Sequence, residues 1–289
     1  FLQFPTGRHA TMIEAGKSHT CAVMDNNDLI CWGDNSKGQL GLGDTDKRGD
    51  ASSEIGNNFA VTSVPSGRTV DSMALGWDHT CVVWDNYSVS CWGGNDHGQL
   101  GLDSTTIVGN ESGQMGDNLD FLDLPGTASA ITAGDGFTCA IVDDNGNDRA
   151  FCWGLNDYGQ LGIESTTNVG DGSGSSISSI SKADLTYDVL AIDAGEDHVC
   201  AIVDRGNNPV QCWGNGADGR LGYGSQDSRG TGPGSASGMG SNLPYVRLTS
   251  SSNHYAYTVT DLEVGAGTTC VIMSNNDIIC WGDNGIGQL

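Results

Sequence analysis

The sequence has few basic residues, no long apolar run and no helical periodicity, and each absence narrows the range of structures. No stretch of its 289 residues approaches the roughly 18 consecutive apolar residues of a transmembrane helix. Only 12 Lys and Arg residues stand against 36 Asp and Glu, which gives a formal net charge of −24. Such a surface repels nucleic-acid phosphates and anionic lipid headgroups, so both are disfavoured as partners. The 44 glycines, without a helical pattern, favour an all-β structure of short strands and many turns.

The cysteines come in five pairs, and no cysteine is left over. Each second cysteine is followed directly by Trp-Gly, and the pattern returns about every 60 to 70 residues. The pairs are Cys21 and Cys31, Cys81 and Cys91, Cys139 and Cys152, Cys200 and Cys212, and Cys270 and Cys280. The tryptophans are Trp32, Trp92, Trp153, Trp213 and Trp281. The chain is therefore built from repeats.

These pairs could form disulfides or bind metal. Zinc sites commonly place cysteines two to four residues apart, whereas here each pair is separated by a stretch long enough to form a hairpin. Disulfides are the favoured interpretation, and they predict an oxidising environment. We therefore expect a secreted or cell-surface protein. The sequence starts with Phe1 rather than Met and shows no signal peptide, so we interpret it as a processed or partial chain.

The spacing within a pair predicts a hairpin. If Cys21 lies opposite Cys31, residues 22 to 24 pair with 30 to 28 and leave a three-residue loop at 25–27, a common hairpin length. Alternation then places Cys21, Val23, Leu29 and Cys31 on one face of the hairpin, and Ala22, Ile30 and Trp32 on the other. Because both faces are apolar, each hairpin must be packed between neighbours.

A second motif follows each Trp-Gly. In the first repeat it is Asn35, Gly38, Gln39, Leu40 and Gly41, and the fourth repeat departs from it with Gly216 and Arg220. The combined pattern resembles the regulator of chromosome condensation repeat family. The resemblance implies a β-propeller of four-stranded blades, usually seven in number. We expect one propeller domain over 1–289, incomplete or open, with five repeats near 1–43, 44–103, 104–164, 165–224 and 225–289.

Aromatic and histidine side chains are the next candidates for a site. The five repeated tryptophans are expected to pack blade against blade. Trp77 and Trp84 lie outside that register, so whichever is exposed is the better candidate for a partner contact. His19, His79 and His198 share one repeat position, which Phe137 and Thr268 occupy elsewhere. Such replacement favours a structural hydrogen-bonding role over metal binding.

Two loop motifs each have a functional interpretation beside a structural one. The tripeptide Arg48-Gly49-Asp50 matches one read by integrin-type receptors, although its glycine also belongs to the repeated loop pattern. Two acidic sets could bind calcium weakly, although neither has the spacing of a twelve-residue calcium loop. These sets are Asp44, Asp46 and Asp50, and Asp143, Asp144 and Asp148. Turn formation on a solvated rim is the simpler interpretation, and no other cofactor is expected.

No catalytic triad, nucleophile elbow, phosphate-binding loop or dinucleotide motif stands out, so we expect no enzyme. The main hypothesis is a non-catalytic extracellular scaffold that binds protein or assembles with itself into a larger surface or fibrous structure. The alternative is a secreted inhibitor or receptor-binding module with an exposed aromatic patch on one rim. Guanine nucleotide exchange on a small GTPase, the activity of the family's namesake, is disfavoured because disulfides do not suit the nucleus.

Overall fold

A computed structural model describes residues 4–207, 209–234, 236–248 and 257–289. In this part of the chain the strands form five antiparallel sheets of three consecutive strands each. The strands are β1 Ala10–Ala15, β2 His19–Met24, β3 Leu29–Gly33, β4 Val70–Leu75, β5 His79–Trp84, β6 Val89–Gly93, β7 Ala128–Ala133, β8 Phe137–Asp143, β9 Asp148–Gly154, β10 Val189–Ala194, β11 His198–Val203, β12 Val210–Gly214, β13 Val259–Val264, β14 Thr268–Met273 and β15 Ile278–Gly282. The 3-10 helices are η1 Ser52–Glu54, η2 Gly56–Asn58, η3 Gly116–Asn118, η4 Ile177–Ser179, η5 Ala217–Gly219 and η6 Gly240–Asn242.

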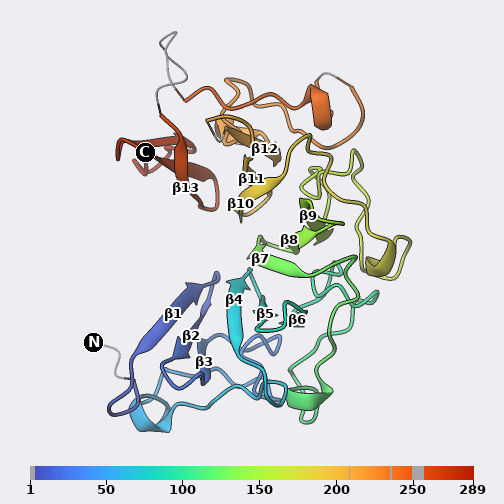
Figure 1. The fold of residues 1–289 in the computed structure, drawn as a ribbon. Helices are drawn as coiled ribbons and strands as arrows, with labels where there is room; N and C mark the ends of the chain where they lie inside the picture. Colours follow the sequence, from blue (N-terminus) through green and yellow to red (C-terminus); the bar gives the residue numbers. More distant parts are fainter. Residues whose placement is uncertain (1–3, 208, 235, 249–256) are drawn as a thin grey trace.

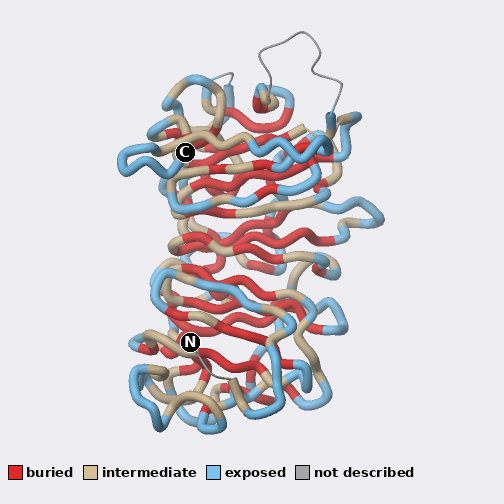
Figure 2. The backbone as a smooth tube through the Cα atoms, turned by 90° about the vertical axis from the view of Figure 1, so that its left-hand side faces the viewer, coloured by how far each residue is buried: buried red, intermediate tan, exposed pale blue. Residues whose placement is uncertain are grey.

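The five sheets lie in an arc around a common axis, with the sheet of β1 at one end and the sheet of β13 at the other (Figure 1). The first strand of each sheet faces the axis, and the loops between sheets lie on the outside. Figure 2 shows that the strands of the middle sheets are mostly buried, whereas exposed backbone is concentrated in the loops. In the described residues, no helix is long and apolar enough to cross a membrane.

The blades contain three strands, and the expectation of four was wrong. The segment at the fourth-strand position makes a single backbone hydrogen bond to the third strand. Thr62 N–H donates to the Leu29 carbonyl over 2.8 Å, and Leu122 N–H to the Val89 carbonyl over 2.8 Å. Prolines stand within three residues of these contacts at Pro65 and Pro125. The Ala183 N–H makes the same contact with the Ala150 carbonyl over 2.8 Å, and no proline lies within three residues of Ala183, so proline is not required for the pairing to stop.

The predicted hairpin register is confirmed. Cys21 pairs with Cys31, Ala22 with Ile30 and Val23 with Leu29, and the corresponding residues of the other sheets pair in the same way. The two predicted faces are also present, because Cys21 and Val23 belong to one buried cluster and Ala22 and Ile30 to another. All ten cysteines are joined within their hairpins, with Cα–Cα distances of 4.0 to 4.1 Å.

Neighbouring blades are joined through the repeated tryptophan. The Trp92 Nε1–H donates to the Gln39 carbonyl oxygen of the preceding blade over 3.1 Å, and Trp153 donates to the Gln99 carbonyl over 2.9 Å. Trp281 uses the Arg220 carbonyl at 2.9 Å. Since the acceptor is a backbone oxygen, the motif keeps this contact in the repeat where Arg replaces Gln.

The repeated form of the loop after each Trp-Gly comes from its own amide side chains. Asn35 Oδ1 accepts from the Leu40 N–H over 2.9 Å, while its Nδ2 donates to the Asp44 and Asp46 carbonyls. Gln39 Oε1 accepts from the Lys37 N–H over 2.9 Å. These buried amides replace the backbone hydrogen bonds that an irregular loop lacks, and they fix the carbonyl on which the next blade docks.

Candidate functional site: the central cavity

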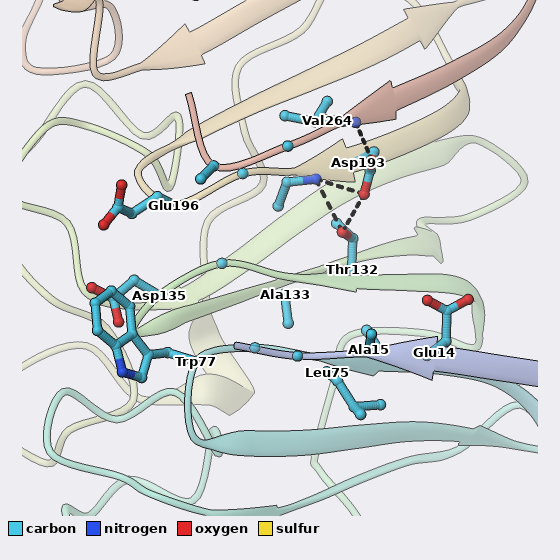
Figure 3. A pocket seen from close by; sticks show the side chains of 18 of the residues that line it. Glu14, Ala15, Leu75, Trp77, Thr132, Ala133, Asp135, Asp193, Glu196 and Val264 are labelled. Carbon is cyan, nitrogen blue, oxygen red and sulfur yellow. Dashed lines mark hydrogen bonds between the residues drawn. The ribbon is translucent and has the colours of Figure 1, made fainter. Parts of the chain in front are cut away.

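The inner strands line an open cavity of about 630 Å³ along the axis of the arc. Its wall is made by the ends of β1, β4, β7, β10 and β13 and by the turns that follow them (Figure 3). Each blade contributes its Gly and the adjoining residue, and the residues after these glycines are Lys17, Trp77, Asp135, Glu196 and Ala266. The same repeat position thus gives a cation, an indole, two carboxylates and a methyl group.

Asp193 is the carboxylate held most firmly in the wall. Its Oδ1 accepts from the Thr132 hydroxyl and from the Ala194 N–H, both over 2.9 Å, and its Oδ2 accepts from the Val264 N–H over 2.6 Å (Figure 3). Burial raises the pKa of Asp193 to about 6, and nearby Glu263 acts in the same direction, against the effect of these hydrogen bonds. Asp193 joins three adjacent blades through β7, β10 and β13.

Asp135 and Glu196 lie at the turn end of the cavity, which we call the mouth. The Asp135 N–H donates to the Glu196 carbonyl over 3.0 Å, so the two residues are fixed on adjacent blades. Burial raises the pKa of Asp135 to about 6, and the carboxylates of Asp197, Glu196 and Asp78 add to the shift. Negative charge is therefore concentrated at the mouth beyond what the single Lys17 can offset.

Trp77 forms an aromatic wall of the same mouth. Its backbone N–H donates to the Gly134 carbonyl over 3.3 Å, and the ammonium of Lys17 lies 2.6 Å from its ring centroid. A cation above an indole face is attracted by the ring quadrupole, typically by about 0.5–2 kcal/mol. The mouth therefore already holds one ammonium group between an aromatic face and carboxylates.

Glu14 and Glu263 extend the negative potential toward the two ends of the arc. Both occupy the position of Asp193 in their own blades, opposite Cys21 and Cys270 respectively. Burial raises the pKa of Glu14, and the charge of Glu263 adds to this shift. The cavity wall as described includes carboxylates, one amine and one indole, and no Ser, Cys or His. Such a lining is suited to binding cations.

The structure separates the two tryptophans that lie outside the repeat register. Trp84 is fully buried and donates to the Ser90 hydroxyl over 3.1 Å, so it belongs to the core. Trp77 is half-buried and lines the cavity mouth. The acidic residues of the cavity were missed at the sequence level. The only available signal was their position before or after the glycine that ends each inner strand.

The predicted histidine contacts are present between blades. His19 Nε2 lies 2.9 Å from the Thr80 hydroxyl, and His198 Nε2 lies 3.0 Å from the Thr269 hydroxyl. Both histidines are buried, and burial lowers the pKa of His19 to about 4 and that of His198 to about 3. These residues join blades and do not line the cavity.

The loop motifs are held by local bonds. Arg48 forms an ion pair with Asp44 at 2.6 Å, and Lys47 forms one with Asp50 at 2.6 Å, so both charged ends of the Arg-Gly-Asp tripeptide are engaged within their own loop. Asp44 also accepts from the Asp46 N–H over 2.9 Å. Among the described residues, no three His, Cys, Asp or Glu side chains are grouped in a way that could hold a metal ion.

A second group of aromatic residues lies on the opposite rim, near the tip of the β11–β12 hairpin. The Arg205 guanidinium carbon lies 4.5 Å from the Tyr245 ring centroid and 5.6 Å from that of Tyr187. Both tyrosines are half-buried, whereas Arg205 is exposed. Tyr and Arg are frequent in the energetic centres of protein interfaces.

Comparisons with known proteins agree with this architecture. Models of the regulator of chromosome condensation (RCC1) repeat match residues 13–39, 128–160 and 259–288, and a second RCC1 model matches residues 147–202. Yeast RCC1 (Prp20), solved in complex with Kap60, superposes with a TM-score of 0.66 at 17% identity. That alignment covers 98% of this chain and 59% of the yeast chain, and it supports the fold alone.

Two curated relatives illustrate the range of proteins with similar sequences. The ultraviolet-B receptor UVR8 of Arabidopsis thaliana is 29% identical over 236 residues, covering 79% of this chain and 46% of the receptor. The X-linked retinitis pigmentosa GTPase regulator of Canis lupus familiaris is 32% identical over 159 residues, covering 55% of this chain and 14% of that protein. The chain thus spans less than half the length of either relative.

Proposed function

Because the chain belongs to the regulator of chromosome condensation (RCC1) repeat family, we propose that it is a non-catalytic, extracellular protein-binding scaffold. Similar sequences occur in an ultraviolet-B receptor and in a GTPase regulator. In this chain the binding surface would be the cavity mouth formed by Trp77, Lys17, Asp135 and Glu196. Its partner would present a basic segment.

The extracellular location is supported by the disulfides. The described residues include no free cysteine, and all five bridges connect strands within a blade. Closing a loop of 10 to 13 residues contributes about 2–3 kcal/mol in the chain-entropy model. A reducing cytosol would keep these thiols from pairing. A blade stack with such bridges is suited to conditions where chaperones and reductants are absent.

The observation that carries the binding role is the half-exposed indole of Trp77 among carboxylates at one end of the cavity. Aromatic side chains that are held in place at the edge of a cavity lose little entropy on binding, and they dominate many interfaces. Surrounding negative charge selects partners with Lys or Arg and speeds their encounter. Lys17 occupies the indole face in the absence of a partner and would be displaced by a competing cation.

Binding of labelled peptides rich in Lys and Arg, measured by fluorescence anisotropy against neutral and acidic peptides of equal length, tests this role. We expect binding of the basic peptides only, weakened about 30-fold by Trp77→Ala, which corresponds to a hot spot of about 2 kcal/mol. Tyr158→Ala, which removes another exposed aromatic ring outside the cavity, is the matched control and should bind normally. Equal binding of acidic peptides, or no effect of Trp77→Ala, would refute the proposed surface.

A receptor-binding or inhibitory role through the opposite rim is the second candidate. It is supported by the stacked side chains of Tyr187, Arg205 and Tyr245. The Arg205→Ala variant would distinguish the two surfaces, because it should leave basic-peptide binding unchanged while weakening any partner that docks on this rim.

A further inference from the structure

The chain contains two Asn-x-Ser triplets in which the middle residue is not proline. Their asparagine side chains differ in exposure and in hydrogen bonding. They are Asn86-Tyr87-Ser88 and Asn110-Glu111-Ser112. This triplet is the acceptor sequence for N-linked glycosylation, which places a bulky, hydrated glycan on surface loops of secreted proteins.

We propose that Asn86 is a site of N-linked glycosylation and that Asn110 is not. The inference rests on the proposed extracellular location, because glycans of this type are added outside the cytosol. The transfer would join the Asn86 Nδ2 to the C1 carbon of a sugar. In that step the bond between C1 and the phosphate oxygen of a lipid-linked oligosaccharide donor breaks, Nδ2 loses one proton, and the lipid phosphate leaves.

Asn86 lies at the tip of the β5–β6 hairpin, where the side chain is exposed. The turn is closed by a hydrogen bond from the Tyr87 N–H to the Trp84 carbonyl over 2.7 Å, and Tyr87 adopts a positive φ of 66°. Asn86 Oδ1 accepts from the Ser88 hydroxyl over 2.7 Å. The serine of the triplet therefore contacts the amide oxygen, and among the described residues none accepts a hydrogen bond from Asn86 Nδ2.

The equivalent turns of other blades show why this arrangement is distinctive. In the first blade Asn26 Nδ2 donates to the Asp28 carboxylate over 2.7 Å, and in the fifth blade Asn275 Nδ2 donates to the Asp277 carboxylate over 2.5 Å. Ser88 stands where those aspartates stand. The change from Asp to Ser thus creates the acceptor triplet and also releases the amide nitrogen that would react.

Asn110 is placed in a packed loop. Its Oδ1 is buried without a hydrogen-bond partner among the described residues. Its backbone nitrogen packs against Gly38 of the preceding blade. A Cβ atom added at Gly38 would lie 2.5 Å from this nitrogen. Because Oδ1 and Nδ2 are bonded to the same carbon atom, the burial of Oδ1 leaves little space around the nitrogen that would carry a glycan. The native fold therefore has room for a glycan at Asn86 and not at Asn110.

The position of Asn86 is compatible with the proposed binding surface. Trp77 precedes β5 and Asn86 follows it, so the two side chains lie at opposite ends of a six-residue strand. At a rise of about 3.4 Å per residue, this strand separates them by roughly 20 Å. A glycan at the hairpin tip would therefore shield one rim of the arc and leave the cavity mouth accessible.

The test is to secrete the full chain from a eukaryotic host and release glycans with peptide N-glycosidase in heavy-oxygen water. Peptide mass spectrometry then identifies labelled aspartate at each former acceptor. We expect label at position 86 alone, loss of the glycan in Ser88→Ala, and no change in the matched control Ser112→Ala. Asp28→Ser, which creates the same triplet in the first blade, should add a second glycan at Asn26.

A secreted protein with five disulfides and no glycan at Asn86 would overturn the inference while leaving the extracellular scaffold intact. A glycan at Asn110 in folded protein would also overturn it. Free thiols in the secreted material, counted by alkylation before reduction, would instead contradict the proposed extracellular role. The two failures are therefore distinguished in one preparation.

Discussion

His79 Nε2 lies 3.0 Å from the hydroxyl oxygen of Thr138 in the next blade. That hydroxyl donates its own proton to the Gln99 carbonyl over 2.9 Å, so it can only accept from the histidine. The ring therefore carries a proton on Nε2, while its Nδ1 is buried without a hydrogen-bond partner among the described residues. Burial lowers the pKa of His79 to about 3, and the charge of His19 acts in the same direction. Protonation of Nδ1 would keep this contact but would bury a charge without a partner, so the junction is most stable while the histidine is neutral.

This relationship predicts an acid-dependent loss of stability. A folded-state pKa of about 3, against about 6.5 in the unfolded chain, means that the unfolded state takes up the proton first as the pH falls. The contribution to stability is complete above pH 6.5 and declines by up to about 1.4 kcal/mol per pH unit below it. Urea unfolding between pH 7 and 4 measures this decline.

The chain itself offers the matched variant, because Phe137 and Val199 occupy the His and Thr positions at the next junction. We expect the double variant His79→Phe, Thr138→Val to become more stable relative to the natural sequence as the pH falls from 6.5 to 4. A stability difference that does not vary with pH would show that His79 is already protonated or exposed in the folded state.

The contribution of Asp135 to stability should change with pH in the opposite direction to that of His79. Its folded-state pKa of about 6 exceeds the ordinary value, so its contribution is complete below about pH 4 and is lost as the pH rises through 6. Asp135→Asn is therefore expected to raise the midpoint of thermal unfolding at pH 7.5 and to have little effect at pH 4. Asp120→Asn, an exposed carboxylate outside the cavity, is the control. A lower midpoint for Asp135→Asn at pH 7.5 would contradict the inferred repulsion.

A comparison of alanine variants at Gly98 and Gly146 distinguishes the cost of backbone strain from the cost of a steric clash between blades. Both adopt a φ near +84°, at 83° and 84°, so alanine should cost about 1–2 kcal/mol at either position through conformation alone. A Cβ on Gly98 would lie 2.5 Å from the Asp171 nitrogen, whereas a Cβ on Gly146 would meet nothing within 4 Å. We expect Gly98→Ala to be the more destabilising variant by a further 1–3 kcal/mol or so in urea unfolding. Equal effects would show that the contact with the next blade is loose.

Removal of one buried disulfide should weaken the arc without changing its shape. The Cys139→Ala, Cys152→Ala double variant opens a bridge with a sequence separation of 13, for which the expected loss is about 3 kcal/mol. Chemical denaturation under non-reducing conditions gives the free energy, and far-ultraviolet circular dichroism checks that the sheets persist. A loss below about 1 kcal/mol would mean that blade packing alone fixes the hairpin.

The sequence was sufficient for features that depend on neighbouring residues. The register of the Cys21–Cys31 hairpin and its two apolar faces follow from the spacing and from alternation, and both are confirmed. The fourth strand was predicted wrongly because its existence depends on whether a distant segment such as Thr62 can pair beyond one residue. Local sequence carries no such information.

The cavity required knowledge of how blades are arranged. Asp193 and Thr132 lie on different blades, and only the curvature of the arc brings them together. At the sequence level the acidic residues resembled ordinary turn-forming or solvated side chains. The exposure of Trp77 likewise depends on the strand end on which it lies, and Trp84 at the other end of β5 is buried.

The docking of each repeated tryptophan on the carbonyl of the blade before it gives the array a direction. Every junction has a donor side and an acceptor side. Trp153 donates to the carbonyl of Gln99 in the blade before it, so the donor always belongs to the later blade in the chain. Under a pulling force applied to its two ends, such an array should come apart one junction at a time from whichever terminus is weaker. Because each hairpin stays closed by its disulfide, every detached repeat would lengthen only by the chain between one cysteine pair and the next.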